Sequence, residues 1–230
     1  MSDTKYAYAV ARIRALENGL FSSAQIEQLL SVKSYEGALR FLTEHGWGGA
    51  DTPLSAEAIL TREKAKSWET VRDLLKGDDA ILAVLSYGDL YHNLKAAIKD
   101  AAAPGSHGNV YFDDCEVDGA RMSKIVAEKD WQALPAHMRE AAKEASETFL
   151  HTGDGQLCDI IVDRSALAAI YECGKNASDA IIRDYAETTV AVADIKIAVR
   201  SQKTGKHLDF MRRAMAPCDS LNIERLSQAG

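Results

Sequence analysis

Proline is scarce in this chain, and its scarcity constrains the fold more than any other feature. The 230 residues contain only Pro53, Pro104, Pro135 and Pro217. The long intervals between them carry much alanine, leucine, glutamate and lysine, which favour helix, whereas proline interrupts it. The sequence therefore predicts an all-α protein, with at most a short extended piece at residues 109–112.

The helices can be placed by their apolar periodicity and by residues that favour helix ends. They are expected at residues 4–18, 22–31, 34–45, 55–76, 78–102, 118–129, 134–151, 155–172, 177–203, 206–215 and 220–228. Side chains suited to N-caps are Ser22, Ser34, Ser55, Asp78 and Ser178, and glycines suited to C-caps are Gly19, Gly77, Gly153, Gly174 and Gly205.

The segment PGSHGNVYFDDCEVDG, residues 104–119, is the clearest interruption of the helical pattern. It is rich in glycine and acidic residues, which are typical of loops between packed segments. We therefore expect a linker here and two helical units, at residues 1–108 and 109–230.

The stretch YGDLYHNLKAAIK, residues 87–99, has the spacing of an amphipathic helix. Its apolar stripe occupies positions i, i+4, i+7 and i+8, which share one helical face. The stripe consists of Leu90, Leu94, Ala97 and Ile98, and the basic residues Lys95 and Lys99 lie off it.

A second stretch, TTVAVADIKIAVRSQK at residues 188–203, repeats this pattern. Aligning Asn93 with Asp194 brings NLKAAIK onto DIKIAVR. The apolar positions return as Ala191, Ile195, Ala198 and Val199, and the basic positions return as Lys196 and Arg200. We interpret the two stretches as copies of one long helix and expect both stripes to be buried.

The polar residues of the first copy are not repeated in the second. Val190, Val192 and Ala193 stand where Asp89, Tyr91 and His92 would be expected. Asp89 and His92, one helical turn apart, are therefore interpreted as a local polar pair or as a cap on neighbouring backbone.

Composition excludes several functional classes. The formal net charge of −7 disfavours nucleic-acid binding, and no apolar run approaches the ~20 residues of a membrane-spanning helix. The N-terminus lacks the apolar core of a secretory signal. The cysteines form no CxxC pair and no zinc-ligand spacing, so reduced thiols of a cytosolic protein are expected at Cys115, Cys158, Cys173 and Cys218.

The residues resemble a known family. YAYAVARIRALENGLFSSAQIEQLLSVKSYEGALRFLTEHGWG looks like the first helices of the C-type subunits of archaeal-type and bacterial V-type ATPases, which are related to the d-type subunits of eukaryotic V-ATPases. YGDLYHNLKAAIK is similar to that family's Asp-Tyr-His-Asn-Leu-Lys helix, with Leu90 inserted. GQLCDIIVDRSALAAIYE followed by IIRDYAETTVAVADIKIAVR resembles its second unit, with Val190 and Asp194 departing from the family's Asp and Asn.

The resemblance implies a mechanical role. Such proteins are similar to a funnel of three related helical units, of which this sequence matches two, so the third is expected to be absent. They connect the central shaft to the membrane rotor ring and transmit torque between ATP hydrolysis or synthesis and ion transport. The implied partners are the ring and the shaft, the implied location is cytoplasmic with membrane contact only through the ring, and no catalytic residue, cofactor or metal is implied.

Two rival interpretations remain from the residues alone. Asp89 and His92, with Asp113 or Asp114, could hold a metal in a small helical hydrolase. The chain could also be a generic helical adaptor. The HTGDGQ stretch at residues 151–156 lacks the lysine of a phosphate loop and the ligands of a calcium loop, so a helix–helix turn is expected there.

Overall fold

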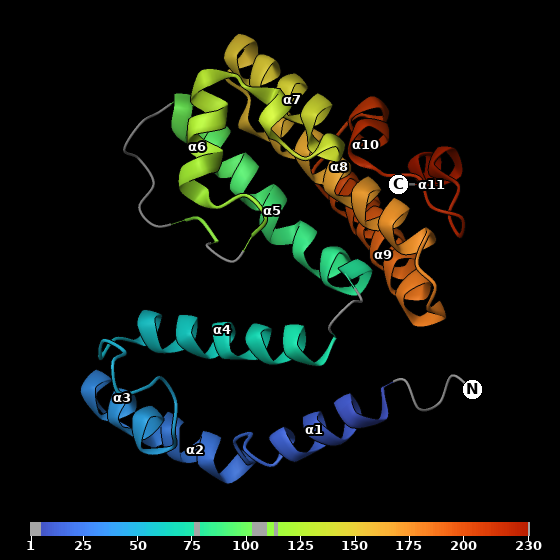
Figure 1. The fold of residues 1–230 in the computed structure, drawn as a ribbon. Helices are drawn as coiled ribbons and strands as arrows, with labels where there is room; N and C mark the ends of the chain where they lie inside the picture. The colour runs from blue at the N-terminus through green and yellow to red at the C-terminus, as the bar shows by residue number, and fades with distance from the viewer. Residues whose placement is uncertain (1–5, 76–78, 103–109, 113–114, 230) are drawn as a thin grey trace. The chain divides into compact units, whose positions relative to one another are not determined.

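The computed structural model describes residues 6–75, 79–102, 110–112 and 115–229. Regular structure in these residues is helical, which confirms the all-α prediction. The helices are α1 (Ala7–Glu17), α2 (Ser23–Ser31), α3 (Tyr35–Glu44), α4 (Ala56–Leu74), α5 (Asp79–Ala102), α6 (Gly119–Glu128), α7 (Arg139–Thr152), α8 (Gly155–Lys175), α9 (Ala180–Lys203), α10 (Leu208–Ala214) and α11 (Ile223–Ala229), with 3₁₀ turns η1 (Trp131–Ala133) and η2 (Ala136–Met138) (Figure 1). None of the described helices is long and apolar enough to cross a membrane.

The chain forms two compact units, residues 1–78 and 79–230. In the first unit, α2, α3 and α4 begin at serine caps whose hydroxyls accept backbone N–H groups, as predicted for Ser22, Ser34 and Ser55. A small aromatic cluster holds its loops together, with Phe21 stacked on Trp47 at a centroid distance of 5.1 Å.

The second unit is built on α8, which packs against α5, α7 and α9 (Figure 1). Its main core buries the apolar side of α5 against α6, α7 and α8. This packing places α5 in the second compact unit, so the units divide earlier than the boundary expected at 108/109. That expectation concerned units of repeated sequence, and in that sense it stays a prediction.

The packing of α8 on α9 depends on a close backbone approach. A Cβ atom on Gly174 would lie 2.1 Å from the Cβ of Ala186, so only glycine fits here. Gly174 therefore lies inside α8 as a contact residue, and its predicted role as a C-cap is wrong. The predicted cap at Gly153 is confirmed, because this residue ends α7 with a φ of 65°.

The two long helices bury different amounts of their predicted stripes. On α5, Leu90, Leu94, Ala97 and Ile98 are all buried. On α9, Ala198 is buried and Ala191 is half-buried, but Ile195 and Val199 are exposed. The prediction that Ile195 and Val199 are buried is therefore wrong within this chain.

The stripes on α5 and α9 differ in burial because the two helices have different neighbours. Helix α5 packs mainly against α6, α7 and α8, whereas α9 packs mainly against α8 and the short helices α10 and α11, and α5 and α9 touch only slightly. The buried face of α9 is accordingly a rotated set of residues, Ala186, Val190, Asp194, Ala198 and Ser201. Apolar periodicity identified the helix correctly but not the face that its neighbours cover.

Candidate docking surface on the long helices

Tyr91 ties α5 to two other elements. Its hydroxyl donates to the backbone oxygen of His137 at 2.9 Å and lies 2.9 Å from Nδ1 of the same residue. The Ser165 hydroxyl of α8 donates to the Tyr91 oxygen at 3.2 Å. Burial raises the pKa of Tyr91 to about 12 and lowers the pKa of His137, so both are neutral near pH 7. This is a structural cross-tie between α5, η2 and α8.

His92 and Asn93 anchor the extended segment at residues 110–112. His92 donates from Nε2 to the Val110 carbonyl at 2.8 Å. The fully buried Asn93 amide accepts from the Phe112 N–H and donates to the Phe112 carbonyl, both at 2.8 Å. His92 thus binds backbone, but in a segment 18 residues further along the chain and not in the neighbouring turn that the sequence interpretation expected, while Asp89 is half-buried.

The metal-hydrolase interpretation gains no ligand cluster from these contacts. No three His, Cys, Asp or Glu residues meet in a metal-binding arrangement among the described residues. Asp113 and Asp114, which that interpretation invoked, lie outside the described residues. All four cysteines are free thiols.

Asp194 occupies on α9 the place that Asn93 has on α5. Both side chains are 0% exposed. The Oδ1 of Asp194 accepts from the Ala216 N–H at 3.1 Å, but its Oδ2 has no hydrogen-bond partner among the described atoms. Burial raises the pKa of Asp194 to about 6, against the lowering effects of the Ala216 N–H and the Arg164 charge. Burying this carboxylate in its ionised form therefore costs free energy, and a neutral amide at the same position would not carry the cost of a buried charge.

The segments bound by these two side chains also correspond. Phe112 and Ala216 precede the first residues of α6 and α11 by the same number of positions. Each of those helices has its N-cap side chain bonded to an arginine N–H: Asp118 to Arg121 at 2.9 Å, and Asn222 to Arg225 at 3.0 Å. The matched contacts support the predicted repeat. Sequence reasoning missed this part because the spacing between copies changes after the long helix.

The basic positions of the two copies differ in their partners. On α5, Lys95 pairs with Asp163 at 2.7 Å and Lys99 pairs with Asp159 at 2.6 Å, both on α8. On α9, Lys196 and Arg200 are exposed and form no ion pair with a described residue. The second copy therefore presents two cations that have no carboxylate partner among the described residues.

A groove of about 450 Å³ brings three of these four cations together. It runs between α5, α8 and α9, and its lining includes His92, Lys95, Asp163, Lys196 and Arg200 beside apolar residues such as Leu167. One carboxylate faces three cations, so the groove suits a carboxylate-bearing partner. We call these residues the basic groove.

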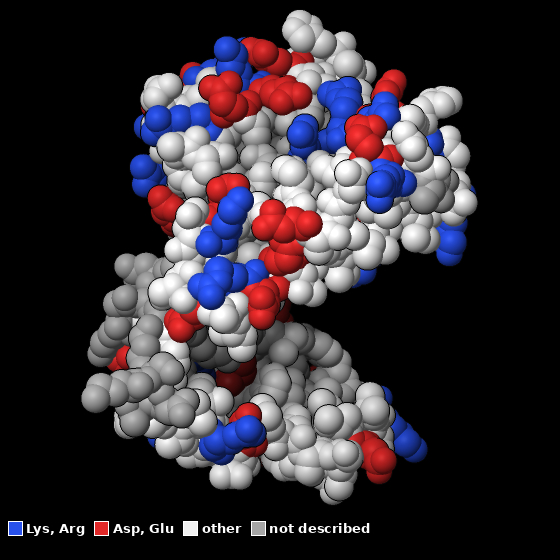
Figure 2. Space-filling model, turned by 90° about the vertical axis from the view of Figure 1, so that its right-hand side faces the viewer, with Lys and Arg blue, Asp and Glu red and all other residues white. Residues whose placement is uncertain are grey.

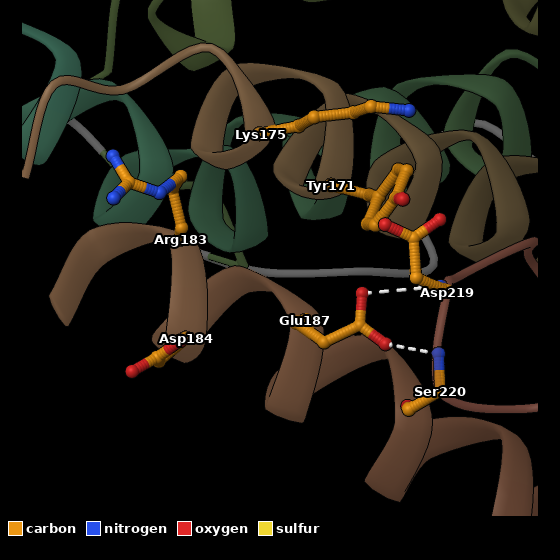
Figure 3. A pocket seen from close by; sticks show the side chains of 7 residues that line it. All are labelled: Tyr171, Lys175, Arg183, Asp184, Glu187, Asp219 and Ser220. Carbon is orange, nitrogen blue, oxygen red and sulfur yellow. Dashed lines mark hydrogen bonds between the residues drawn. The ribbon is translucent and has the colours of Figure 1, made fainter. Parts of the chain in front are cut away.

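A second hollow, of about 380 Å³, lies where the end of α8 meets the start of α9. Figure 3 shows Glu187 reaching the loop after α10, where its carboxylate accepts from the N–H groups of Asp219 at 3.2 Å and Ser220 at 2.7 Å. Burial opposes ionisation, but these hydrogen bonds outweigh it and lower the pKa of Glu187. A hydrogen bond to Asp219 raises the pKa of Tyr171 to about 12. These contacts fix the loop, and they give the hollow a structural role.

Charges of both signs are interspersed on the face shown in Figure 2. Among the described residues on this face, basic and acidic side chains are intermixed, with uncharged areas between them. With the net charge of −7, this distribution fits protein partners better than a nucleic-acid backbone. The basic groove is thus a local feature of an acidic molecule.

Comparison with known proteins identifies a family. The family model described as ATP synthase (C/AC39) subunit matches residues 9–229, nearly the whole chain. A search among curated proteins found no match.

Proposed function

We propose that this chain, which belongs to the ATP synthase C/AC39 family, is the non-catalytic connector between the central shaft and the membrane rotor ring of a V/A-type ATPase. Membership makes it a component of a multi-subunit ATP synthase. The match over residues 9–229 is the observation that carries the proposal. In this role the chain transmits torque between ATP hydrolysis or synthesis and ion transport.

The internal packing of the second unit suits a part that carries load. Helices α5, α8 and α9 are held by close contact at Gly174, by the Tyr91 cross-tie and by the Lys95–Asp163 and Lys99–Asp159 pairs. Densely packed helices deform little under force, so rotation of one end moves the other. Partly exposed ion pairs add only about 0.2–1 kcal/mol each to stability, so apolar packing supplies most of the stability of this arrangement.

The basic groove is the proposed contact with a neighbouring protein of the complex. Lys196 and Arg200 are exposed, unpaired with described residues and close to apolar surface. We infer that they meet carboxylates of the ring or the shaft. Contact with the membrane itself then passes through the ring, and no nucleic acid is involved.

Binding to purified components tests the proposal. Immobilised shaft and detergent-solubilised ring are each incubated with the chain, and ATP hydrolysis by the chain alone is measured in parallel. We expect binding to the shaft or the ring and no ATP turnover by the chain. Binding to neither, under conditions where a relative from the same family binds, would refute the connector role.

A charge-reversed variant tests the groove. K196E/R200E should weaken the binding, because two proposed ion pairs become repulsive. The matched control K124E/K143E makes the same charge change at exposed positions on α6 and α7. Equal loss in both variants would indicate a response to net charge and not to the groove.

A further inference from the structure

One face of α9 carries a regular line of exposed apolar residues. Ile181, Tyr185, Val192, Ile195 and Val199 are between 42% and 75% exposed. With the exposed Thr188, their spacing alternates between four and three residues, which is the spacing of a coiled-coil contact face. We call these six residues the α9 seam. A contiguous apolar line of this length on a surface is typical of an interaction site.

The equivalent line on α5 is covered within the chain. The alignment that sets Asn93 against Asp194 places Val84, Tyr91, Leu94 and Ile98 opposite Tyr185, Val192, Ile195 and Val199. These four α5 residues are at most 3% exposed, in cores built with α6, α7, α8 and α9. The chain itself therefore shows what covers such a seam: other helices packed side by side with it.

The charges beside the seam describe the missing helix further. Where α8 covers α5, its Asp159 and Asp163, four residues apart, pair with Lys99 and Lys95. Helix α9 retains both cations, as Lys196 and Arg200, without an ion pair among the described residues. A helix that covers the α9 seam as α8 covers α5 would therefore bring two carboxylates with the same spacing.

We propose that the α9 seam binds an amphipathic helix of a partner protein that carries two carboxylates four residues apart beside a face of small and apolar residues. The carboxylates meet Lys196 and Arg200, and the apolar face covers Ile195 and Val199. A second copy of α9 fits this description less well, because no two of its acidic residues, Asp184, Glu187 and Asp194, are four residues apart. The inference concerns only the chemistry of the partner helix and does not rest on the proposed connector role.

The sequence of α8 supplies a probe. A fluorescein-labelled peptide of residues 154–175, with Cys158 and Cys173 replaced by alanine, is titrated with the full chain, and its anisotropy is recorded. A second peptide carries D159K and D163K. The chain variants are I195S/V199S, which removes apolar contact at exposed positions and so leaves folding intact, and K196E/R200E, which reverses the two charges.

The proposal predicts a crossed pattern. The unmodified chain binds the acidic peptide. The affinity of I195S/V199S for this peptide is lower by a factor of about ten or more, and the affinity of K196E/R200E is also lower. The lysine peptide binds poorly to the original chain and regains binding to K196E/R200E, since opposite charges are restored. Circular dichroism confirms that both variants remain helical.

Three results would overturn it. The first is no binding of the acidic peptide by the unmodified chain. The second is equal binding of both peptides by every chain variant, which would mean that Lys196 and Arg200 do not pair with the carboxylates of the peptide. The third is reversible dimerisation of the chain, measured by sedimentation and abolished by I195S/V199S, which would assign the seam to a second copy. If the chain bound neither the shaft nor the ring, the result of the peptide titration would be unaffected. The connector role and the partner helix of the α9 seam are therefore tested separately.

Discussion

Replacing Asp194 by asparagine should stabilise the second unit at neutral pH and change how its stability depends on pH. The carboxylate is 0% exposed, one of its oxygens has no partner among the described atoms, and its pKa is raised to about 6 by burial. At the matching position of α5, Asn93 uses both ends of its amide on backbone groups. An amide can make such contacts without placing a charge in the core.

The size of the effect follows from the pKa. Because the fold raises the pKa from 3.8 to about 6, it favours the protonated form, and the free energy of unfolding falls as pH rises between these values. The full cost, roughly 3 kcal/mol, is present above about pH 6 and nearly absent below about pH 4. The D194N variant carries no such cost. An amide hydrogen left unpaired would subtract about 1–3 kcal/mol at every pH, so the pH-dependent part is the cleaner measurement.

Urea unfolding at pH 4 and pH 7.5 measures this. In a W47F/W68F background, Trp131 is the remaining tryptophan and packs against the core of the second unit. We expect the stability advantage of D194N over the unmodified carboxylate to grow by about 2–3 kcal/mol between the two pH values.

The reverse change at the matching site is the control. N93D should destabilise the second unit at pH 7.5 more than at pH 4, because it introduces a buried carboxylate where the side-chain amide now donates to a backbone carbonyl. If the difference between D194N and the unmodified protein is the same at both pH values, folding does not change the pKa of Asp194, and the raised pKa that we assign to its burial is wrong.

Ile98→Asp should lower the free energy of unfolding, measured with urea, by about 3 kcal/mol or more, because it puts a charge in the core. Val199→Asp, at the aligned position of α9, should lower it by under about 1 kcal/mol, because Val199 is exposed. Similar losses in the two variants would contradict the different burial of the two faces. Gly174→Ala should lower stability by about 1–3 kcal/mol, since the new methyl overlaps α9, and an unchanged unfolding midpoint would disprove the close approach. Glu187→Gln should speed hydrogen exchange at the two loop amides that its carboxylate accepts from; unchanged exchange there would show that the loop is held by other contacts.

The sequence determined the class of fold and most helix ends. Scarce proline, helix-favouring composition and apolar periodicity are local properties, so they can be read without knowing what packs on what. The caps at Ser22, Ser34 and Ser55 illustrate this, because a cap serine bonds to an amide three residues away. Ser178 was predicted as a cap, and the structure instead places Asp179 before α9.

The tertiary structure decided which face of each helix is covered. One alignment predicted the same stripe on α5 and α9, but Ile98 is buried and Val199 is exposed, because their neighbouring helices differ. The pairing of Lys95 with Asp163 could not be predicted either, since the two residues lie far apart in the sequence and meet only when α5 packs on α8. Periodicity specifies that a helix has an apolar side, whereas burial and charge pairing depend on long-range contacts that local sequence does not encode.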